Sequence, residues 1–282
     1  MKRDNSPYSG IVRQSSGDAH GFMRKLGCKR RDRIRFLLVH DAKRNRAGSG
    51  SSSSSRRRAI QLRKTLGRIE RRTPQIRLVG SRNEPVHLLG RNAQGYAVFM
   101  EINARGGEGD AVRSIRAQFI DVDLNKVTAQ LADRSEAKRK IRAIRATPRE
   151  RIASVDVRRT QDGRYRLVAH RTERRVKQLK RAFLKKHRER IKDAMIVETS
   201  NGYHIYWVVK GAAVDRFVPI QKALARKFGS DPMITNLTRV MRMPGFYHMK
   251  NPRKPYLVRV VQWGRKKPFT QDELIRKFGL KP

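Results

Sequence analysis

Apolar residues in the middle of the chain follow the two-residue period of β-strands. Residues 96–102 are largely apolar and predict one strand. Residues 115–123 predict a second strand, which stays apolar until Asp121 and Asp123 appear at its end. Because side chains two apart on a strand point to the same side, these two carboxylates should project together while Val122 turns into the core.

Other segments show the periods of hairpins and helices. Residues 155–168 contain an Asp-Gly turn between two β-rich runs, and residues 196–209 contain Asn201-Gly202 between two more, so both predict β-hairpins. The spacing of apolar residues, together with a capping box that begins at Thr270, predicts helices at residues 59–74, 124–145, 173–193, 215–228 and 270–282. A closing strand is expected at 256–263.

The same patterns predict how the chain is divided. Residues 1–58 are basic and rich in serine and glycine, so we expect a disordered tail that cannot bury enough apolar surface to fold. A basic helix at 59–74 would follow. Further strands and helices are expected over 75–268, which includes a basic insert at about 146–194, and a C-terminal helix would occupy 269–282. The length allows one large domain or two small ones.

Charge narrows the choice of partner. The 282 residues include 68 Lys and Arg but only 24 Asp and Glu, a formal net charge of +44. A nucleic acid is the natural polyanion to balance this excess, although a purely structural RNA-binding protein would share it. No lipid-facing helix or lipidation signal points to a membrane. The basic insert is equally compatible with a solvated helix face and with a nucleic-acid groove.

The number of cysteines indicates the redox state of the compartment and limits the kinds of metal site that the chain could form. Cys28 is the single cysteine, which excludes a disulfide framework or a cysteine-rich zinc site within this chain. Its scarcity fits a reducing environment, so we expect a cytoplasmic protein. No apolar run has the length of a transmembrane helix.

Three clusters of polar residues are candidates for chemistry. Asp121 and Asp123 could hold Mg²⁺ or Mn²⁺ against phosphates, or could simply end a strand. His204 lies on the more polar face of its hairpin beside a tight glycine turn, which favours a functional role over a structural one. Arg239 and Arg242, three residues apart before a Pro-Gly turn, could bind phosphate or join Asp231 in a salt-bridge network.

The order of these clusters is similar to that of a known family. A strand-borne Asp-x-Asp comes first, Ser-x-Gly-Tyr-His-x-Tyr-Trp second, and an Asp-Pro followed by Arg-x-x-Arg-x-Pro-Gly and a lysine third. Over roughly residues 75–265 the chain resembles the archaeo-eukaryotic primase superfamily, and within it the RepB-like DNA primases of plasmids and other mobile elements. The segment 246–249 and Ala97 depart from the pattern of that family.

The resemblance implies a fold, an activity and a set of residue roles. It implies an α+β core with an RRM-like antiparallel sheet half and a metal-dependent nucleotidyltransferase that makes or extends a primer from (d)NTPs on single-stranded DNA. Unwinding and origin recognition would come from a separate helicase or origin-binding protein. The implied catalytic and metal-binding residues are Asp121, Asp123 and Asp231, and His204 is an implied catalytic residue. The implied nucleotide-binding residues are Ser200, His204, Arg239, Arg242 and Lys250.

Elementary chemistry agrees with these roles and leaves two alternatives. Phosphoryl transfer needs neutralised phosphate charge and an activated hydroxyl, which metal-bound carboxylates and cationic donors can supply. Exposed aromatic residues such as Tyr203 would stack on template bases. A non-catalytic nucleic-acid-binding protein with an RRM-like sheet is the main alternative. An initiator endonuclease is disfavoured, because His204 is followed by Ile205 and Tyr206 and the sequence has no His-x-His pair.

Overall fold

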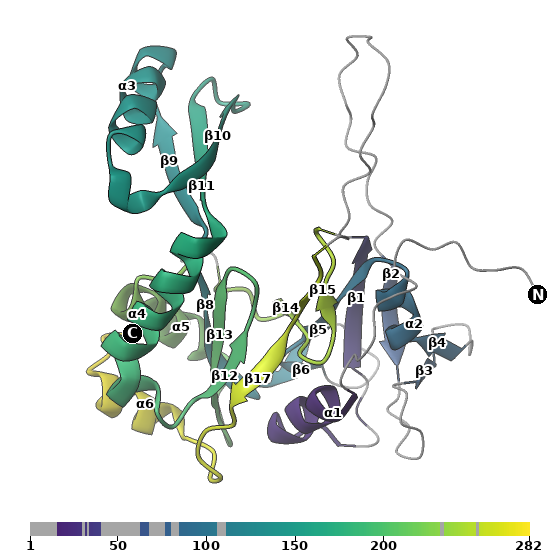
Figure 1. Ribbon diagram of the computed structural model, residues 1–282. Helices are drawn as coiled ribbons and strands as arrows, with labels where there is room; N and C mark the ends of the chain where they lie inside the picture. Colours follow the sequence, from purple (N-terminus) through teal and green to yellow (C-terminus); the bar gives the residue numbers. More distant parts are fainter. Residues whose placement is uncertain are drawn as a thin grey trace, which may run out of the picture. The chain divides into compact units, whose positions relative to one another are not determined.

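A computed structural model describes most of the chain (Figure 1). The described residues are 16–29, 32, 34–40, 63–67, 77–79, 85–105, 111–231, 234–251 and 254–282. Contacts divide the chain into two compact units, which are described separately below. The first comprises residues 1–120, 193–200 and 204–282, and the second comprises 121–192 and 201–203. None of the helices in the described ranges is long and apolar enough to cross a bilayer.

The first unit contains two four-stranded sheets. One has the strand order β14-β5-β1-β2, with β14 at Val240–Arg242, β5 at Tyr96–Glu101, β1 at Ile34–His40 and β2 at Arg63–Gly67. The other has the order β17-β12-β13-β8, with β17 at Arg259–Gln262, β12 at Met195–Glu198, β13 at Gly202–Val208 and β8 at Ala117–Asp123. The last three residues of β8 and the first two of β13 belong to the second unit. The pairs of the first sheet are antiparallel throughout.

Helices and short strands complete the first unit. The helices are α1 (Ser16–Lys25), α2 (Leu88–Ala93), α5 (Phe217–Phe228) and α6 (Gln271–Phe278). The short strands are β3 (Arg77–Val79), β4 (Pro85–His87), β6 (Ala104–Arg105), β7 (Val112–Ser114), β15 (Tyr247–His248) and β16 (Tyr256–Leu257). The buried Gln221 amide of α5 donates to the Phe119 carbonyl and accepts from the Phe119 N–H at 3.2 Å, which joins α5 to β8. Trp207, Phe228 and Phe278 pack with ring centroids 5.2–5.6 Å apart.

The second unit is built on a three-stranded antiparallel sheet. Its order is β10-β11-β9, with β10 at Ile152–Arg159, β11 at Tyr165–Arg171 and β9 at Lys126–Leu131. The helices are α3 (Arg134–Arg145), the short 3₁₀ helix η1 (Pro148–Glu150) and α4 (Glu173–Ile191). Residues 121–192 hold 24 Lys and Arg against 9 Asp and Glu, so this unit carries much of the positive charge of the chain.

Two predictions for the N-terminal part are wrong where the structure describes it. Within the expected tail, residues 16–25 form α1 and residues 34–40 form β1. Helix α1 buries Ala19, Phe22 and Met23, and Leu26 directly after it is also buried, which completes the i, i+3, i+4, i+7 spacing of an apolar helix face. Residues 63–67 of the expected basic helix form β2, which pairs antiparallel with β1 from Ile34↔Gly67 to Leu38↔Arg63. The remainder of 1–58 and of 59–74 lies outside the described residues.

The expected helix at 124–145 is wrong in its first half. Residues 126–131 form β9, in which side chains alternate between more and less exposed and which pairs with β11 over its whole length. The helix starts later, at α3, where the Asp133 side chain caps it by accepting from the Glu136 N–H at 2.7 Å. Strand pairing with a distant segment therefore overrides the helical preference of this stretch.

Several other predictions are confirmed. Strands are found at 96–101 and 117–123, the Asp-Gly hairpin is β10–β11, and the basic helix is α4. The capping box of α6 is present, with Thr270 and Glu273 as its two members. The closing strand is interrupted at Val258 and forms β16 and β17. The mixed α/β class with several antiparallel sheets is as expected, and the RRM-like half stays a prediction.

Candidate nucleotide and metal site

Strand β8 presents its two aspartates as the sequence predicts. Val122 is buried, Asp121 is partly exposed and Asp123 is exposed, so the two carboxylates share the accessible side of the strand. One oxygen of Asp123 accepts the Asn125 N–H at 2.9 Å, and the other lies 3.0 Å from the Lys126 ammonium. This end of β8 is therefore acidic and accessible, and one of its carboxylates forms an ion pair with a lysine side chain.

The backbone between the two aspartates lies directly against Gly202. A Cβ atom at Gly202 would stand 1.7 Å from the Val122 carbonyl oxygen, closer than any real contact. The Leu124 N–H donates to the Asn201 carbonyl at 2.9 Å beside it. Glycine is therefore required at 202 because only glycine allows the two backbones to approach this closely.

This close approach corrects the predicted hairpin loop. The hairpin itself is present, since β12 and β13 are neighbours in the sheet. However, β12 ends at Glu198 and β13 begins at Gly202, so residues 199–201 form the connection and Gly202 is a strand residue. The Asn-Gly pair predicted the correct topology, but the glycine serves the contact with Val122 and not the two-residue turn.

Arg171 anchors the segment that follows the aspartates. Its Nη1 atom donates to the Leu124 carbonyl at 3.0 Å and to the Lys126 carbonyl at 3.3 Å. Its Nε atom pairs with Glu150, which is also 3.8 Å from Arg175. The turn after Asp123 is thus fixed to β11 and η1 by one partly buried guanidinium.

In the first unit, the buried His204 side chain is influenced by the charges of Arg242, Arg239 and His248; we call these four residues, together with Ser200, the His204 pocket. His204 is 7 % exposed, and its Nδ1 atom is 3.4 Å from the Tyr206 hydroxyl. Burial, together with Arg242, Arg239 and His248, lowers the pKa of His204 from 6.5 to about 3. The imidazole is therefore neutral at physiological pH, and the charge around it favours an anion.

The neighbours of His204 supply hydrogen-bonding groups to this pocket. The Ser200 hydroxyl and His248 Nδ1 are 2.6 Å apart. The Arg242 guanidinium lies over the Phe99 ring at 4.6 Å, and β14 holds Arg242 opposite Phe99 in the sheet. Within the described part of the chain, the buried Nε of Arg239 has no hydrogen-bond partner. A phosphate oxygen would satisfy such a donor.

The third predicted acidic position has a different environment. Asp231 is partly exposed, and one of its oxygens is 3.9 Å from Arg239 Nη2, so part of the alternative salt-bridge network exists. Asp231 belongs to the first unit and the two β8 aspartates to the second. Lys250 is exposed on the first unit. Residues 232 and 233, which follow Asp231 in the predicted motif, lie outside the described residues.

The donor set on β8 fits a hard divalent cation. Asp121 and Asp123 offer carboxylate oxygens on one side of a strand, the ligands that Mg²⁺ and Mn²⁺ prefer. Among the described residues, no group of three or more His, Cys, Asp or Glu could hold a metal. A pair is nonetheless compatible with Mg²⁺, which is commonly held by one or two carboxylates together with substrate phosphates.

Three contributors to this chemistry were missed by sequence reasoning, namely His248, Arg171 and Gly202 in its strand role. The signal for His248 was its place just after the Pro244-Gly245 turn. The other two act through contacts with Val122, Leu124 and Lys126 that no local pattern reveals. One expectation was wrong: Tyr203 is 3 % exposed, lies under the Lys180 ammonium and stacks on Phe183, so it cannot stack on bases.

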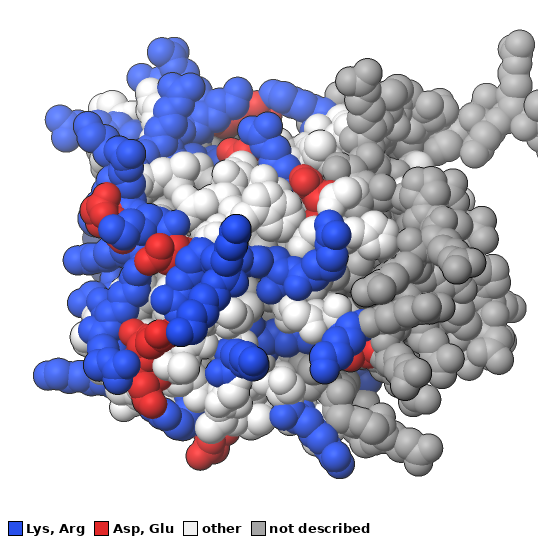
Figure 2. Space-filling view, turned by 90° about the horizontal axis from the view of Figure 1, so that it is seen from below, with Lys and Arg blue, Asp and Glu red and all other residues white. Residues whose placement is uncertain are grey.

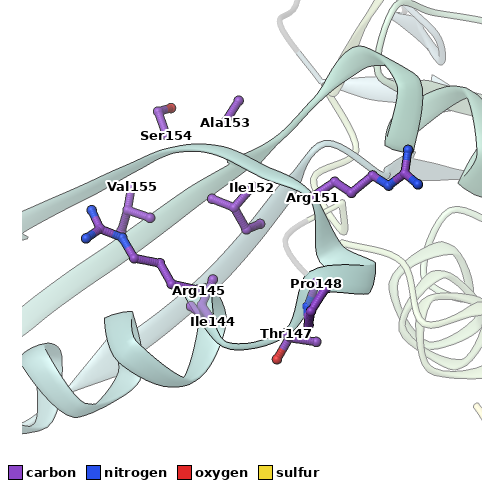
Figure 3. Close-up of a pocket in the computed structure, with 9 residues that line it drawn as sticks. All are labelled: Ile144, Arg145, Thr147, Pro148, Arg151, Ile152, Ala153, Ser154 and Val155. Carbon is purple, nitrogen blue, oxygen red and sulfur yellow. The ribbon is translucent and has the colours of Figure 1, made fainter.

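The basic surface extends well beyond these residues. Figure 2 shows Lys and Arg spread over the described surface of one face, with Asp and Glu confined to small patches. A pocket of about 300 Å³ in the second unit lies between the end of α3 and β10. Its Arg145 and Arg151 guanidinium groups point away from each other (Figure 3), so they do not converge on a phosphate.

Comparison with known proteins gives one family. A family model described as the RepB DNA-primase N-terminal domain matches residues 116–280. The chain is similar to the crystal structure of primase RepB′ with a TM-score of 0.46 and 13% identity, over 94% of this chain and 62% of that chain, less than two thirds of its length. It is also similar to the catalytic domain of primase Repb′ in complex with initiator DNA, with a TM-score of 0.45 and 12% identity, over 94% of each chain. No curated protein matches it.

Proposed function

This chain belongs to the RepB DNA-primase N-terminal domain family, and from this premise we propose that it synthesises primers on single-stranded DNA from (d)NTPs in a metal-dependent reaction. The observation that carries the proposal is the His204 pocket. A neutral buried imidazole with Arg239, Arg242 and His248 around it favours an anion of high charge. The triphosphate of a nucleotide is such an anion.

Each group of the pocket has a role in holding the triphosphate. Arg242 is oriented by its contact with Phe99, and the unpartnered Nε of Arg239 is a donor for a phosphate oxygen. The Ser200 hydroxyl and His248 Nδ1 are 2.6 Å apart, so both groups are placed beside the proposed phosphate position. Negative charge in the pocket raises the pKa of His204, because it offsets the arginines that lower it. His204 then becomes a better hydrogen-bond donor to the phosphates.

Asp121 and Asp123 would hold Mg²⁺ or Mn²⁺. When bound, the ion supplies charge neutralisation on the phosphates and lowers the pKa of the attacking hydroxyl. The chain contributes the position of the carboxylates, which Gly202 and Arg171 fix through the backbone on either side of Val122 and Asp123. Asp231 remains a proposed third ligand. Lys250, exposed on the first unit, is a proposed contact for triphosphate or template.

Primer synthesis on labelled single-stranded DNA tests the proposal. Wild-type protein should give product with Mg²⁺ or Mn²⁺ and none with a chelator. Asp121→Asn with Asp123→Asn should lower the rate at least about a thousandfold, as expected when charge-stabilising groups are lost, while DNA binding stays intact. The matched control is Asp162→Asn, an exposed carboxylate in the β10–β11 turn, which should leave the rate unchanged.

A second candidate is a non-catalytic single-strand binding protein. It is favoured by the ion pairs of Asp123 with Lys126 at 3.0 Å and Asp231 with Arg239 at 3.9 Å, since both carboxylates already have cationic partners. In that case no product forms under any metal or nucleotide, and the wild type and the double variant bind DNA equally. In either case, unwinding and origin recognition would be supplied by separate proteins.

A further inference from the structure

The sheet of the second unit has one covered face and one open face. Helix α3 packs on one side of β10-β11-β9 (Figure 1), where Leu131, Leu167 and Ala169 form the buried core with Ala137 of the helix. Because side chains alternate along a strand, the residues between these point to the opposite side. We call that side the open face.

The strand registers fix which residues share the open face. Arg166, Val168 and His170 lie along the central strand β11. Arg166 pairs with Arg158 of β10 and with Gln130 of β9, and His170 pairs with Lys126 of β9. Arg166, Arg158 and Lys126 are exposed, and Val168 and His170 are half-buried. The sheet residues on this side are therefore accessible, unlike those under α3.

The shape and chemistry of the open face suit an extended single strand of nucleic acid. Alternate side chains of β11 are about 6.8 Å apart, twice the rise per residue of a strand. Arg166, Val168 and His170 follow each other in this row, and a base can stack on the imidazole of His170, as bases do on aromatic side chains in sheet-based single-strand sites. Val168 pairs with Thr128 of β9 and with Asp156 of β10. Both of these side chains are short, so they leave the row uncovered.

Charge complementarity points to the same ligand. Arg158, Arg166 and Lys126 face outward in a segment with 24 Lys and Arg against 9 Asp and Glu. Arg158 and Lys126 lie on the flanking strands and Arg166 lies on the central one, so all three can contact the phosphates of a strand laid along β11. Asp156 is the single acidic residue at the described open-face positions, and its carboxylate can accept from an exocyclic amine of a base. A duplex would leave the stacking row unused, because its bases are already stacked.

The open face leads to the aspartates of β8 within the same unit. Lys126, at one corner of the face, is 3.0 Å from Asp123. His170 Nδ1 is 3.5 Å from the Asn125 side chain, and the Asn125 N–H donates to Asp123 at 2.9 Å. A strand lying along β11 therefore ends at the predicted metal-binding carboxylates. Tyr203, the aromatic residue expected to stack on bases, is buried elsewhere in this unit.

We propose that the open face of the β10-β11-β9 sheet is a platform for single-stranded DNA, with Arg158 and Arg166 on the phosphates and His170 against a base. The inference rests on the proposed function, since the bound strand is the template that the carboxylates act on. It goes further by assigning the template to a sheet face that the family match and the His204 pocket do not identify.

Binding of a fluorescent single-stranded oligonucleotide at several salt concentrations tests the charged part. Arg158→Gln with Arg166→Gln should weaken binding at least about tenfold. A plot of the logarithm of the binding constant against the logarithm of the salt concentration should become shallower by about 1.4, because each of two lost phosphate contacts contributes about 0.7 to the slope. The matched control, Arg139→Gln with Arg142→Gln, removes the same charge from exposed positions on α3. It should change affinity less than about threefold. Equal losses in the two variants, or no loss in the first, would overturn the platform.

Substitutions of His170 test the stacking part. His170→Ala should weaken binding about fivefold or more without changing the salt slope, and His170→Phe should restore it, because base–aromatic stacking is independent of charge. Duplex DNA of the same length should bind more weakly and be less sensitive to both changes. A variant that loses duplex binding and keeps single-strand binding would contradict the proposal.

The outcomes separate this inference from the proposed function. The Arg158→Gln, Arg166→Gln variant should need a higher template concentration for half-maximal primer synthesis than the Arg139→Gln, Arg142→Gln control, since the lost groups are assigned to the template. If the wild type primes and this variant binds DNA normally, the platform is wrong and the function stands. If the wild type never primes but the variant loses single-strand binding, the platform stands and the function fails.

Discussion

The His204 pocket and the aspartate end of β8 handle charge in opposite ways. His204 is almost fully buried and is kept neutral by burial and by Arg242, Arg239 and His248. Asp121 and Asp123 are at least partly exposed, and Asp123 contacts Lys126. The positive charges around the neutral, buried His204 favour an anion in the first region, whereas exposure leaves the second ready to exchange one cation for another.

The two regions also differ in what fixes them. The His204 pocket is held by side chains, including the Ser200–His248 contact and Arg242 over Phe99. The aspartates are held by backbone, through the contact of Gly202 with the Val122 carbonyl and the bonds from Arg171 to the Leu124 and Lys126 carbonyls. Side-chain substitutions should therefore weaken the pocket gradually, whereas the aspartate end should fail abruptly when its backbone is disturbed.

The largest effect should come from Gly202→Ala. The added methyl group cannot fit 1.7 Å from the Val122 carbonyl, so β13 and the end of β8 must separate. We expect a loss of about 3 kcal/mol or more in the free energy of unfolding, measured by urea denaturation. Gly211→Ala is the control: its φ is +64° with open space around it, so it should cost only about 1 kcal/mol. Similar losses for the two variants would show that the backbone contact is not restrictive.

The next effect should come from Arg242→Gln in the His204 pocket. Triphosphate affinity should fall about tenfold to a hundredfold, since a hydrogen bond to a charged group is worth about 1.5–3 kcal/mol. Fluorescent nucleotide titration measures it. Arg259→Gln serves as the control, because Arg259 is exposed and pairs with Glu198 at 3.0 Å. Unchanged affinity in the Arg242 variant, or an equal fall in the Arg259 variant, would remove the pocket from nucleotide binding.

A smaller effect should appear in the pH dependence of the free energy of unfolding, through the protonation of His204. The pKa of His204 is about 3 in the folded protein and 6.5 without burial, so between these values the unfolded chain binds more protons. The stability that depends on a neutral His204 is therefore present above pH 6.5 and is lost as the pH falls below it. Urea unfolding at pH 7.5 and pH 5 should show a larger drop for wild type than for His204→Asn. Identical drops would mean that His204 titrates normally.

The smallest effect should come from Lys126→Gln at the aspartate end. Removing the ammonium 3.0 Å from Asp123 should lower the Mg²⁺ concentration that half-saturates primer synthesis, by less than about fivefold, because an exposed ion pair is worth about 0–1 kcal/mol. Lys192→Gln removes the same kind of pair, since Lys192 lies 3.0 Å from Glu189 at the same i,i+3 spacing. If Lys126→Gln leaves the required Mg²⁺ concentration unchanged, or raises it, the Lys126 ammonium does not compete with Mg²⁺ for Asp123.

The elements that the sequence predicted correctly are those whose signal is local. The strand ending in Asp121 and Asp123, the Asp-Gly hairpin and the capping box of α6 each depend on residues close together in the chain. The individual site residues were identified from motif order, and their roles remain proposals. Neither the pattern nor the motif order could show how buried His204 is or which cations surround it.

The failures all concern partners that are distant in sequence. Residues 126–131 form a strand because β11, some 40 residues later, pairs with them. Helix α1 and strand β1 fold despite a basic, polar setting because their apolar faces are buried against the rest of the first unit. The sequence predicts Gly202 in a turn, because no neighbouring residue in the chain indicates its contact with Val122, 80 residues earlier.

The most direct test is equilibrium binding of a nucleoside triphosphate to the full chain with and without Mg²⁺. If the His204 pocket holds the phosphates and Asp121 and Asp123 hold the ion, the ion and the nucleotide must strengthen each other's binding. We predict that Mg²⁺ tightens nucleotide binding at least about tenfold in wild type, a coupling of about 1.4 kcal/mol, and does not tighten it in Asp121→Asn with Asp123→Asn. The same Mg²⁺ effect in both proteins would contradict the account.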